Sequence, residues 1–306
     1  MTRREALLTS AALGLSACAS PLPMMDKSLA TGQFIDVDGQ RLHYRILGDG
    51  GPPAIALHGA SGNLRDWAMG PALALARTNR VLLFDRPGLG LSTRPSDGAD
   101  IFVQARLMQA AATHLGFDRA HVIGHSFGGS VAMAWALEFP DSVTGLMLLG
   151  APTQVWQGSV GTLYQLTGNR VTGPLAARLA PRLISDDYVR NSVAGVFAPQ
   201  DPPADYADKL GIDLTLSPRA VRNNGADVAG LKPQVRDMVP RYPGLPMPVE
   251  LIHGSADASV PAKIHSDLTA TQIPRATYQR LDGIGHMPHH VAQPEMLAAL
   301  ARLNAG

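Results

Sequence analysis

The chain has 306 residues, of which 45% are hydrophobic and 17% charged, and its formal net charge is +1. This length can bury a large core as one α/β domain with an insert. The near-zero net charge gives no electrostatic reason to expect nucleic acid as a partner.

The first residues resemble an export signal. Arg3 and Arg4 precede an apolar stretch from Ala6 to Ala17, which is too short to cross a bilayer. The heptapeptide "TRREALL" resembles a twin-arginine signal, which would imply export in the folded state. We therefore expect residues 1–17 to be a signal peptide.

Cys18 is the only cysteine, so the folded part cannot contain a disulfide. The preceding "LSA" makes it resemble the lipobox of bacterial lipoproteins, which implies cleavage before Cys18, acylation of that residue and anchoring in the cell envelope. Residues 18–32 would then be a linker. Two alternatives stay open: ordinary cleavage that releases a soluble periplasmic protein, and a helix of a cytosolic protein.

Strand and helix patterns alternate from Gln33 onward. The range 33–47 contains two period-2 segments around Asp38-Gly39, which predicts a β-hairpin. Short apolar strands then alternate with helical patterns, for example a strand at 80–85 and helices at 63–78 and 101–116. This pattern predicts an α/β fold with a mostly parallel sheet covered by helices on both faces. We assign 33–152 and 247–306 to this core.

A short apolar run at 53–59 ends in glycine, and the loop there, with the sequence "HGASGN", is rich in small residues. Such a loop can supply a backbone N–H to an oxyanion, and we choose Ala60 for that role. Ser61 could add a contact from its side chain. The alternative is a glycine turn that simply ends the strand.

The sequence "GHSFG" places Ser126 between an apolar strand and a helical segment. This strand–turn–helix setting is typical of a nucleophile elbow, where a sharp turn exposes the serine and requires glycine at positions 124 and 128. The N–H of Phe127 would be the second oxyanion donor. The alternative is an incidental serine in a glycine-rich turn.

Strand patterns disappear between 153 and 246, where four helical segments are predicted instead, at 172–185, 185–197, 203–210 and from Ser217-Pro218 onward. We read the range 153–246 as a helical insertion. The pairs Asn169-Arg170 and Arg222-Asn223 could contact a polar group of a ligand, or they could face solvent. Aromatic residues of the insertion suit an apolar pocket or ordinary helix packing (Trp156, Tyr164, Tyr188, Phe197 and Tyr206).

A serine nucleophile needs a base and an orienting acid. His286 follows the last predicted strand between Gly285 and Met287, and it is our choice for the base over His289 and His290, which we expect at a helix surface or cap. Asp257, in "VELIHGSADASVP", lies just past a strand in a loop rich in small residues and is our choice for the acid. Asp282 is a competitor. We expect no metal site, because no cysteine or carboxylate lies at ligand spacing beside these histidines.

With these motifs in place, the chain from Gln33 onward resembles the α/β-hydrolase superfamily. The resemblance implies an eight-stranded, mostly parallel sheet, an inserted helical cap, a Ser126–His286–Asp257 triad and no cofactor. It also implies that Asp85, in "DRPGLGLS", orders a turn. Many relatives have a glutamate shortly after the histidine segment, where this chain has Val291 and Ala292.

The expected reaction is hydrolysis of a carboxylic ester or lactone through an acyl-enzyme intermediate. Serine at position 126 argues against haloalkane dehalogenases and epoxide hydrolases, which use aspartate there. Other reactions that use the same triad stay open, such as carbon–carbon bond hydrolysis and perhydrolysis, and so does a non-catalytic ligand-binding role.

Overall fold

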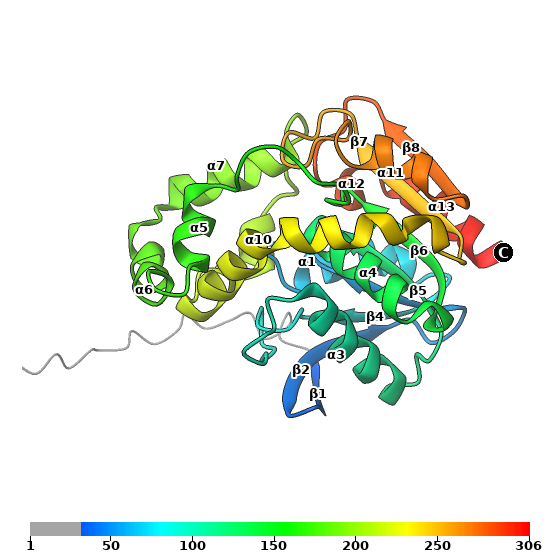
Figure 1. Ribbon diagram of the computed structural model, residues 1–306, viewed down its shortest axis with the longest axis horizontal. Coiled ribbons are helices and arrows are strands. Elements are labelled where there is room, and N and C mark those ends of the chain that lie inside the picture. Colours follow the sequence, from blue (N-terminus) through cyan, green and yellow to red (C-terminus); the bar gives the residue numbers. More distant parts are fainter. Residues whose placement is uncertain (1–31) are drawn as a thin grey trace, which may run out of the picture.

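The computed structural model describes residues 32–306, so the predicted signal peptide and Cys18 lie outside the described residues. Eight strands form one sheet in the order β1-β2-β4-β3-β5-β6-β7-β8 (Figure 1). Their bounds are β1 Gln33–Val37, β2 Gln40–Leu47, β3 Pro53–Leu57, β4 Arg80–Phe84, β5 Ala120–His125, β6 Val143–Leu149, β7 Val249–Gly254 and β8 Ala276–Leu281. The pairs β1–β2 and β2–β4 are antiparallel and the other pairs are parallel, so the sheet is mostly parallel, as predicted.

The predicted hairpin is present. Asp38 and Gly39 both have positive φ angles, 49° and 72°, as a tight turn between β1 and β2 requires. Aspartate and glycine tolerate this conformation better than most residues, which explains why the pair marks the turn in the sequence.

Helices cover both faces of the sheet, and the strands bury side chains on both sides. On β3, Ile55 and Leu57 pack into one core with helices α3 and α4, whereas Ala54 and Ala56 pack into the other with α1, α2 and α13. The helices of this part are α1 Arg65–Ala68, α2 Pro71–Leu75, α3 Ile101–His114, α4 Phe127–Glu138, α11 Ser266–Gln272, α12 Pro288–Val291 and α13 Gln293–Ala305. Burial on two faces explains the continuous apolar runs of the parallel strands.

The single helix predicted over 63–78 is wrong, because the structure has two short helices there, α1 and α2. Gly70 and Pro71 separate them. Proline cannot donate the hydrogen bond that a continuing helix needs, and it disfavours helical backbone in the residue before it. Pro71 instead occupies the start of α2, where the missing N–H costs nothing.

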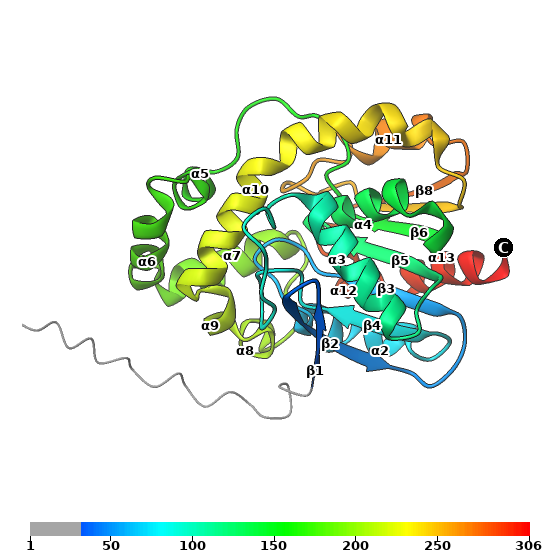
Figure 2. The ribbon, with the colours of Figure 1, turned by 60° about the horizontal axis from the view of Figure 1, so that its bottom comes forward.

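The segment between β6 and β7 holds helices and no strand among its described residues (Figure 2). Its elements are α5 Thr162–Gly168, α6 Gly173–Leu183, α7 Asp186–Phe197, α8 Tyr206–Leu210, α9 Ile212–Thr215, α10 Pro218–Met238 and the 3-10 helix Val239–Gly244. Ser217 caps α10 by accepting a hydrogen bond from the Ala220 N–H at 3.2 Å, as predicted. Within residues 32–306, no helix is both long and apolar enough to cross a membrane.

Candidate active site

Four loops that the sequence singled out meet at one edge of the sheet. They follow β3, β5, β7 and β8, which run parallel, so their carboxyl ends share an edge. Ser126 begins directly after β5, and its N–H donates to the Leu149 carbonyl at the end of β6 at 2.9 Å. The topology therefore brings together residues that are far apart in the chain.

Ser126 sits in a strained turn between β5 and α4, with φ 52° and ψ −126°. Positive φ is uncommon for a residue with a side chain. The turn also brings backbones very close: a Cβ atom added to Gly124 would lie 2.4 Å from the Gly128 carbonyl oxygen, and one added to Gly128 would lie 2.5 Å from the Leu57 carbonyl oxygen. Glycine is therefore required at both positions, and the serine hydroxyl stands at the N-terminus of α4.

Ser126, His286 and Asp257 form a continuous hydrogen-bonded chain. His286 Nε2 lies 2.9 Å from Ser126 Oγ, and His286 Nδ1 lies 2.6 Å from Asp257 Oδ2. A carboxylate only accepts hydrogen bonds, so Nδ1 carries the proton and Nε2 is free to accept the serine proton. Asp282, the competing acid, instead accepts a hydrogen bond from Ser255 Oγ at 3.0 Å and does not reach the imidazole.

Asp257 is buried and held as a carboxylate. Burial alone would raise its pKa, but hydrogen bonds from His253 and His286, together with the Val260 N–H, hold the pKa of Asp257 well below its usual range. The Ser259 N–H donates to the same oxygen as that of Val260. The acid therefore stays charged and can stabilise a positive imidazole next to it.

His125, the residue before the serine, positions the segment that carries His286. Its Nε2 donates to the His286 carbonyl oxygen at 2.8 Å. Burial, followed by the nearby His289 and His286, lowers the pKa of His125 well below its usual value, so this ring is neutral near pH 7. This role of His125 has no local signature in the sequence, because the contact spans 161 residues of chain.

Ala60 and Phe127, the predicted oxyanion donors, line the same cavity as Ser126 and His286. Within the described residues, neither backbone N–H donates to a protein acceptor. Both donors are therefore available to an oxygen atom bound beside Ser126, although their role stays a prediction.

The loop that carries Ala60 is held from the inserted helices. Asn224 of α10 accepts from the Ser61 N–H and donates to Ser61 Oγ, both at 2.8 Å. Ser61 has a positive φ of 53°, a conformation that these two bonds help to fix. Asn224 was missed by sequence reasoning, since 163 residues separate the partners.

A buried arginine supports this loop from below. Arg86 Nε donates to the His58 carbonyl at 3.0 Å, and its guanidinium also pairs with Asp227 of α10 at 3.1 Å and lies 4.3 Å from the centre of the Phe127 ring. Its neighbour Asp85 accepts from the backbone N–H groups of Leu64 and Leu91, so it orders the turn as expected.

The cavity beside Ser126, which we call the Ser126 cavity, has a volume of about 740 Å³. Apart from the residues already named, its wall is mainly apolar and comes largely from the segment between β6 and β7. It includes Trp156, Leu163, Tyr164, Ile184, Tyr188, Val193, Val196, Leu216, Val228 and Leu231. Four of the five aromatic residues noted in the sequence line it, and the fifth, Phe197, packs against Tyr206. This wall suits an apolar ligand more than a charged one.

His289 and His290 are not at a helix surface, which corrects our expectation. His289 is buried and His290 is half-buried with a covered side chain, and both bind Asp66: His289 Nε2 lies 3.0 Å from Oδ2 and His290 Nε2 lies 2.8 Å from Oδ1. Tyr206 donates to the same carboxylate at 2.7 Å. Burial lowers the pKa of His289 to about 4. The expectation failed because Asp66 lies 223 residues away in the chain.

These three side chains also bear on metal binding. Asp66, His289 and His290 offer ligand atoms within 4.8 Å of one another, a set that transition metals accept. The carboxylate, however, already accepts three hydrogen bonds from within the protein, so the cluster is satisfied as it stands. The expectation of no metal at the active site stays a prediction.

Comparison with known proteins assigns the family. Residues 52–293 match the family model described as the alpha/beta hydrolase fold. The chain belongs to this family. An uncharacterized protein of Mycobacterium tuberculosis is 28% identical to this α/β hydrolase over 282 residues, which cover 88% of this chain and 79% of the relative.

Two further similarities are more limited. A 2-hydroxy-6-oxononadienedioate/2-hydroxy-6-oxononatrienedioate hydrolase of Klebsiella pneumoniae is 34% identical over 134 residues, 40% of this chain and 46% of that one. A crystal structure of an esterase from Rhodococcus sp. superposes with a TM-score of 0.69 at 22% identity, covering 90% of this chain and 98% of that one. The second similarity supports the fold of this α/β hydrolase.

Proposed function

We propose that this protein is a serine hydrolase that cleaves a carboxylic ester or lactone. The observation that carries the proposal is the hydrogen-bonded chain from Ser126 Oγ through His286 to Asp257, which opens into a mainly apolar cavity. An apolar cavity suits the acyl or alkyl part of an ester.

In the first half of the reaction, Ser126 Oγ attacks the carbonyl carbon while His286 Nε2 takes the serine proton. The carbonyl oxygen becomes an alkoxide and accepts hydrogen bonds from the N–H groups of Ala60 and Phe127. His286 then gives its proton to the leaving alkoxide oxygen, the ester C–O bond breaks, and an acyl group remains on Ser126.

In the second half, His286 takes a proton from water as the water oxygen attacks the acyl carbon. Collapse of this intermediate returns the proton to Ser126 Oγ and releases the acid. Asp257 keeps the imidazole oriented and stabilises its positive charge in both halves. In a lactone the leaving alcohol stays attached to the acyl group and departs with it.

The direct test is the Ser126→Ala variant assayed with p-nitrophenyl butyrate. We expect kcat to fall by about 10⁴-fold or more, since loss of the nucleophile removes the acylation step. Full activity in this variant would overturn the proposal.

Carbon–carbon bond hydrolysis is a second candidate, because the Klebsiella relative is named as a hydrolase of 2-hydroxy-6-oxononadienedioate and 2-hydroxy-6-oxononatrienedioate. The wall described above offers a dicarboxylate no arginine or lysine among the described lining residues. Ester hydrolysis is therefore our first choice. Turnover of vinylogous diketones that exceeds turnover of any ester in a substrate panel would favour the second candidate.

We also propose that the protein is exported and lipid-anchored through Cys18. The support is the sequence around that residue alone. Metabolic labelling with an alkyne fatty acid should mark the wild type and not Cys18→Ser, and an unlabelled wild type would contradict the anchor.

A further inference from the structure

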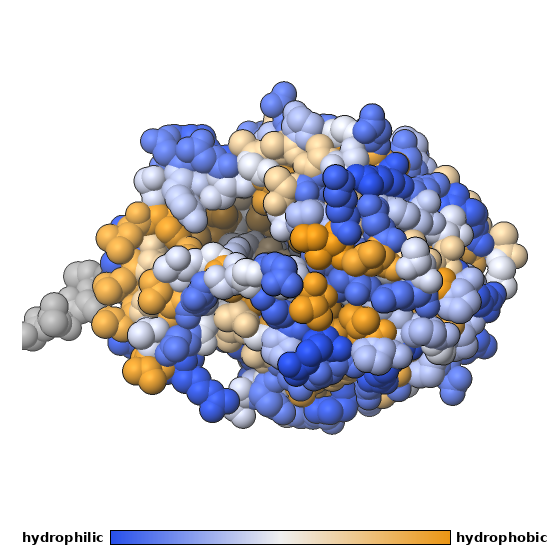
Figure 3. Space-filling model, turned by 45° about the horizontal axis from the view of Figure 1, so that its top comes forward, coloured by the Kyte–Doolittle hydropathy of each residue, from blue (hydrophilic) through white to orange (hydrophobic). Residues whose placement is uncertain are grey.

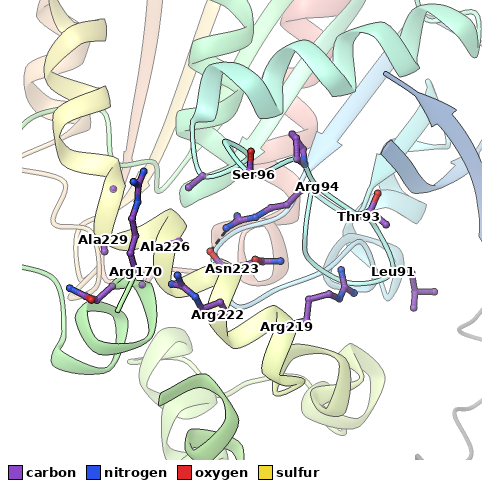
Figure 4. A pocket seen from close by; sticks show the side chains of 15 residues that line it. Leu91, Thr93, Arg94, Ser96, Arg170, Arg219, Arg222, Asn223, Ala226 and Ala229 are labelled. Carbon is purple, nitrogen blue, oxygen red and sulfur yellow. Dashed lines mark hydrogen bonds between the residues drawn. The ribbon is translucent and has the colours of Figure 1, made fainter. Parts of the chain in front are cut away.

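A second cavity, of about 930 Å³, lies between the loop that joins β4 to α3 and the helices α5 and α10 (Figure 4). None of its described lining residues is shared with the Ser126 cavity. We call it the arginine cavity, because its wall carries four arginines and two asparagines: Arg94, Arg170, Arg219, Arg222, Asn169 and Asn223. No aspartate or glutamate occurs among the described residues that line it.

The positive charge of this wall is only partly neutralised, by Asp85 acting on Arg219 and by Asp227. Asp227, just behind it, is the acid that Arg94 contacts at 2.6 Å, but the same carboxylate also pairs with the buried Arg86 at 3.1 Å. Arg219 donates to the backbone carbonyls of Gly90 and Ser92, which are neutral acceptors. Like charges gathered in one hollow repel each other, and an anion bound among them would relieve that repulsion.

Several guanidinium groups of the arginine cavity also have N–H donors that make no hydrogen bond within residues 32–306. Arg94 and Arg222 each use Nη1 for their contacts with protein, and within residues 32–306 their Nε and Nη2 atoms make no hydrogen bond. Arg170 is exposed and has no partner in the same described range. Figure 4 shows the Arg94 side chain reaching Asn223, while Arg222 comes from α10 and Arg170 from the connection between α5 and α6. Guanidinium groups with two free N–H donors match the paired oxygens of phosphate.

We propose that the arginine cavity binds a phosphate-bearing anion. The volume exceeds what an inorganic ion needs and lies in the range of sites for whole small molecules, so the phosphate would belong to an ester such as a soluble metabolite or a lipid headgroup. The wall is built from the inserted helices and the core loop together, so a bound anion would bridge the two parts of the molecule.

A row of exposed apolar side chains begins next to the arginine cavity. Such a row could contact a membrane, which favours a lipid headgroup as one source of the phosphate. Val171 follows Arg170 directly and is 86% exposed, and Leu175, Leu179 and Leu183 continue the row along one face of α6. Figure 3 shows apolar side chains gathered at this end of the molecule. Basic helices with such a row are typical of membrane surfaces.

The first arm measures binding of inorganic phosphate and glycerol 3-phosphate to the full chain by calorimetry at constant ionic strength. We expect the ester to bind more tightly than phosphate. We expect Arg170→Gln/Arg222→Gln to weaken binding about tenfold or more, since each lost bond is charge-assisted. Arg178→Gln removes one charge from α6 outside the cavity and should change affinity less than twofold. If the double variant unfolds, the single variant Arg170→Gln replaces it in the test. We expect this variant to bind glycerol 3-phosphate about threefold more weakly than the wild type does.

The second arm measures co-sedimentation with vesicles of phosphatidylglycerol or phosphatidylcholine, using Cys18→Ser chains so that an acyl anchor plays no part. Recruitment to phosphatidylglycerol that Arg170→Gln reduces more than Arg178→Gln does would identify a lipid headgroup as the source. Binding of glycerol 3-phosphate without recruitment would identify a soluble ester.

Two results would overturn the proposal. One is that the wild type binds neither soluble phosphate compound nor phosphatidylglycerol vesicles. The other is that the Arg170→Gln and Arg178→Gln variants lose binding equally, which would show general charge attraction rather than a site. Ester hydrolysis by Ser126 is measured separately and does not depend on either result.

Discussion

Two buried aspartates each form a hydrogen-bonded cluster with histidines of the segment 286–290. The two clusters differ in the hydroxyl group that takes part in each. Asp257 holds His286, whose other nitrogen faces the hydroxyl of Ser126. Asp66 holds His289 and His290, and its third partner is the hydroxyl of Tyr206. An aspartate–histidine pair is therefore not a catalytic feature in itself. What distinguishes the first cluster is a serine hydroxyl, our proposed nucleophile, in a strained turn on the open side of the imidazole.

Replacing each aspartate by asparagine in turn is the sharpest test of the difference between the two clusters. Asp257→Asn should lower kcat by about 10⁴-fold, because the amide favours the wrong imidazole tautomer. Asp66→Asn should leave kcat within about tenfold and should lower the free energy of unfolding by about 3 kcal/mol, since buried partners lose their charge-assisted bonds. Ester turnover and urea unfolding of both variants measure the contrast. Equal losses of kcat would show that the two clusters act as one.

Much of the first cluster could be predicted from the sequence, and the second could not. The turn around Ser126 has a local signature, because backbone contacts at Gly124 and Gly128 leave no room for a side chain. The loops with Asp257 and His286 each follow a recognisable strand, and parallel strands place their ends at one edge. The contact between Asp66 and His289 has no local signature, so the histidine looked like a surface residue.

The contacts that support the loop with Ala60 also lack a local signature in the sequence. Asn224 and Asp227 lie on one helix of the insertion, and their side chains reach Ser61 and Arg86 of the core. Nothing in the helical pattern of α10 indicates which core loop it covers. The start of that helix was predictable, because Ser217 and Pro218 act locally.

A weaker effect is expected where the inserted helices support the site from a distance. Asn224→Ala should reduce kcat about tenfold with little change in KM, because the loop with Ala60 loses two hydrogen bonds that hold its donor in place. Asn223→Ala, the neighbouring change, is the matched control and should keep kcat within twofold. Steady-state measurement of kcat and KM for both variants with one ester tests this prediction. A change in KM alone would mean that Asn224 contacts substrate instead.

A last effect concerns the dependence of stability on pH. His289 has its pKa lowered to about 4 by burial, against 6.5 for an unfolded chain, so the unfolded state binds more protons between these values. The free energy of unfolding should therefore fall as pH drops from about 6.5 to about 4, with His289 contributing about 3 kcal/mol over the window. Urea unfolding at three pH values should show that the free energy of unfolding depends less on pH in His289→Gln than in the wild type. An unchanged slope would mean that this ring is not the titrating group.

The central claim is that Ser126 is a nucleophile activated by His286, and phosphonylation tests it most directly. A fluorophosphonate should add one phosphonyl group to the wild type, located by peptide mass spectrometry at Ser126. The adduct should be absent in Ser126→Ala, formed far more slowly in His286→Ala, and formed at nearly the wild-type rate in His289→Gln. A wild-type protein that stays unmodified, or that carries the adduct on another residue, would contradict the account.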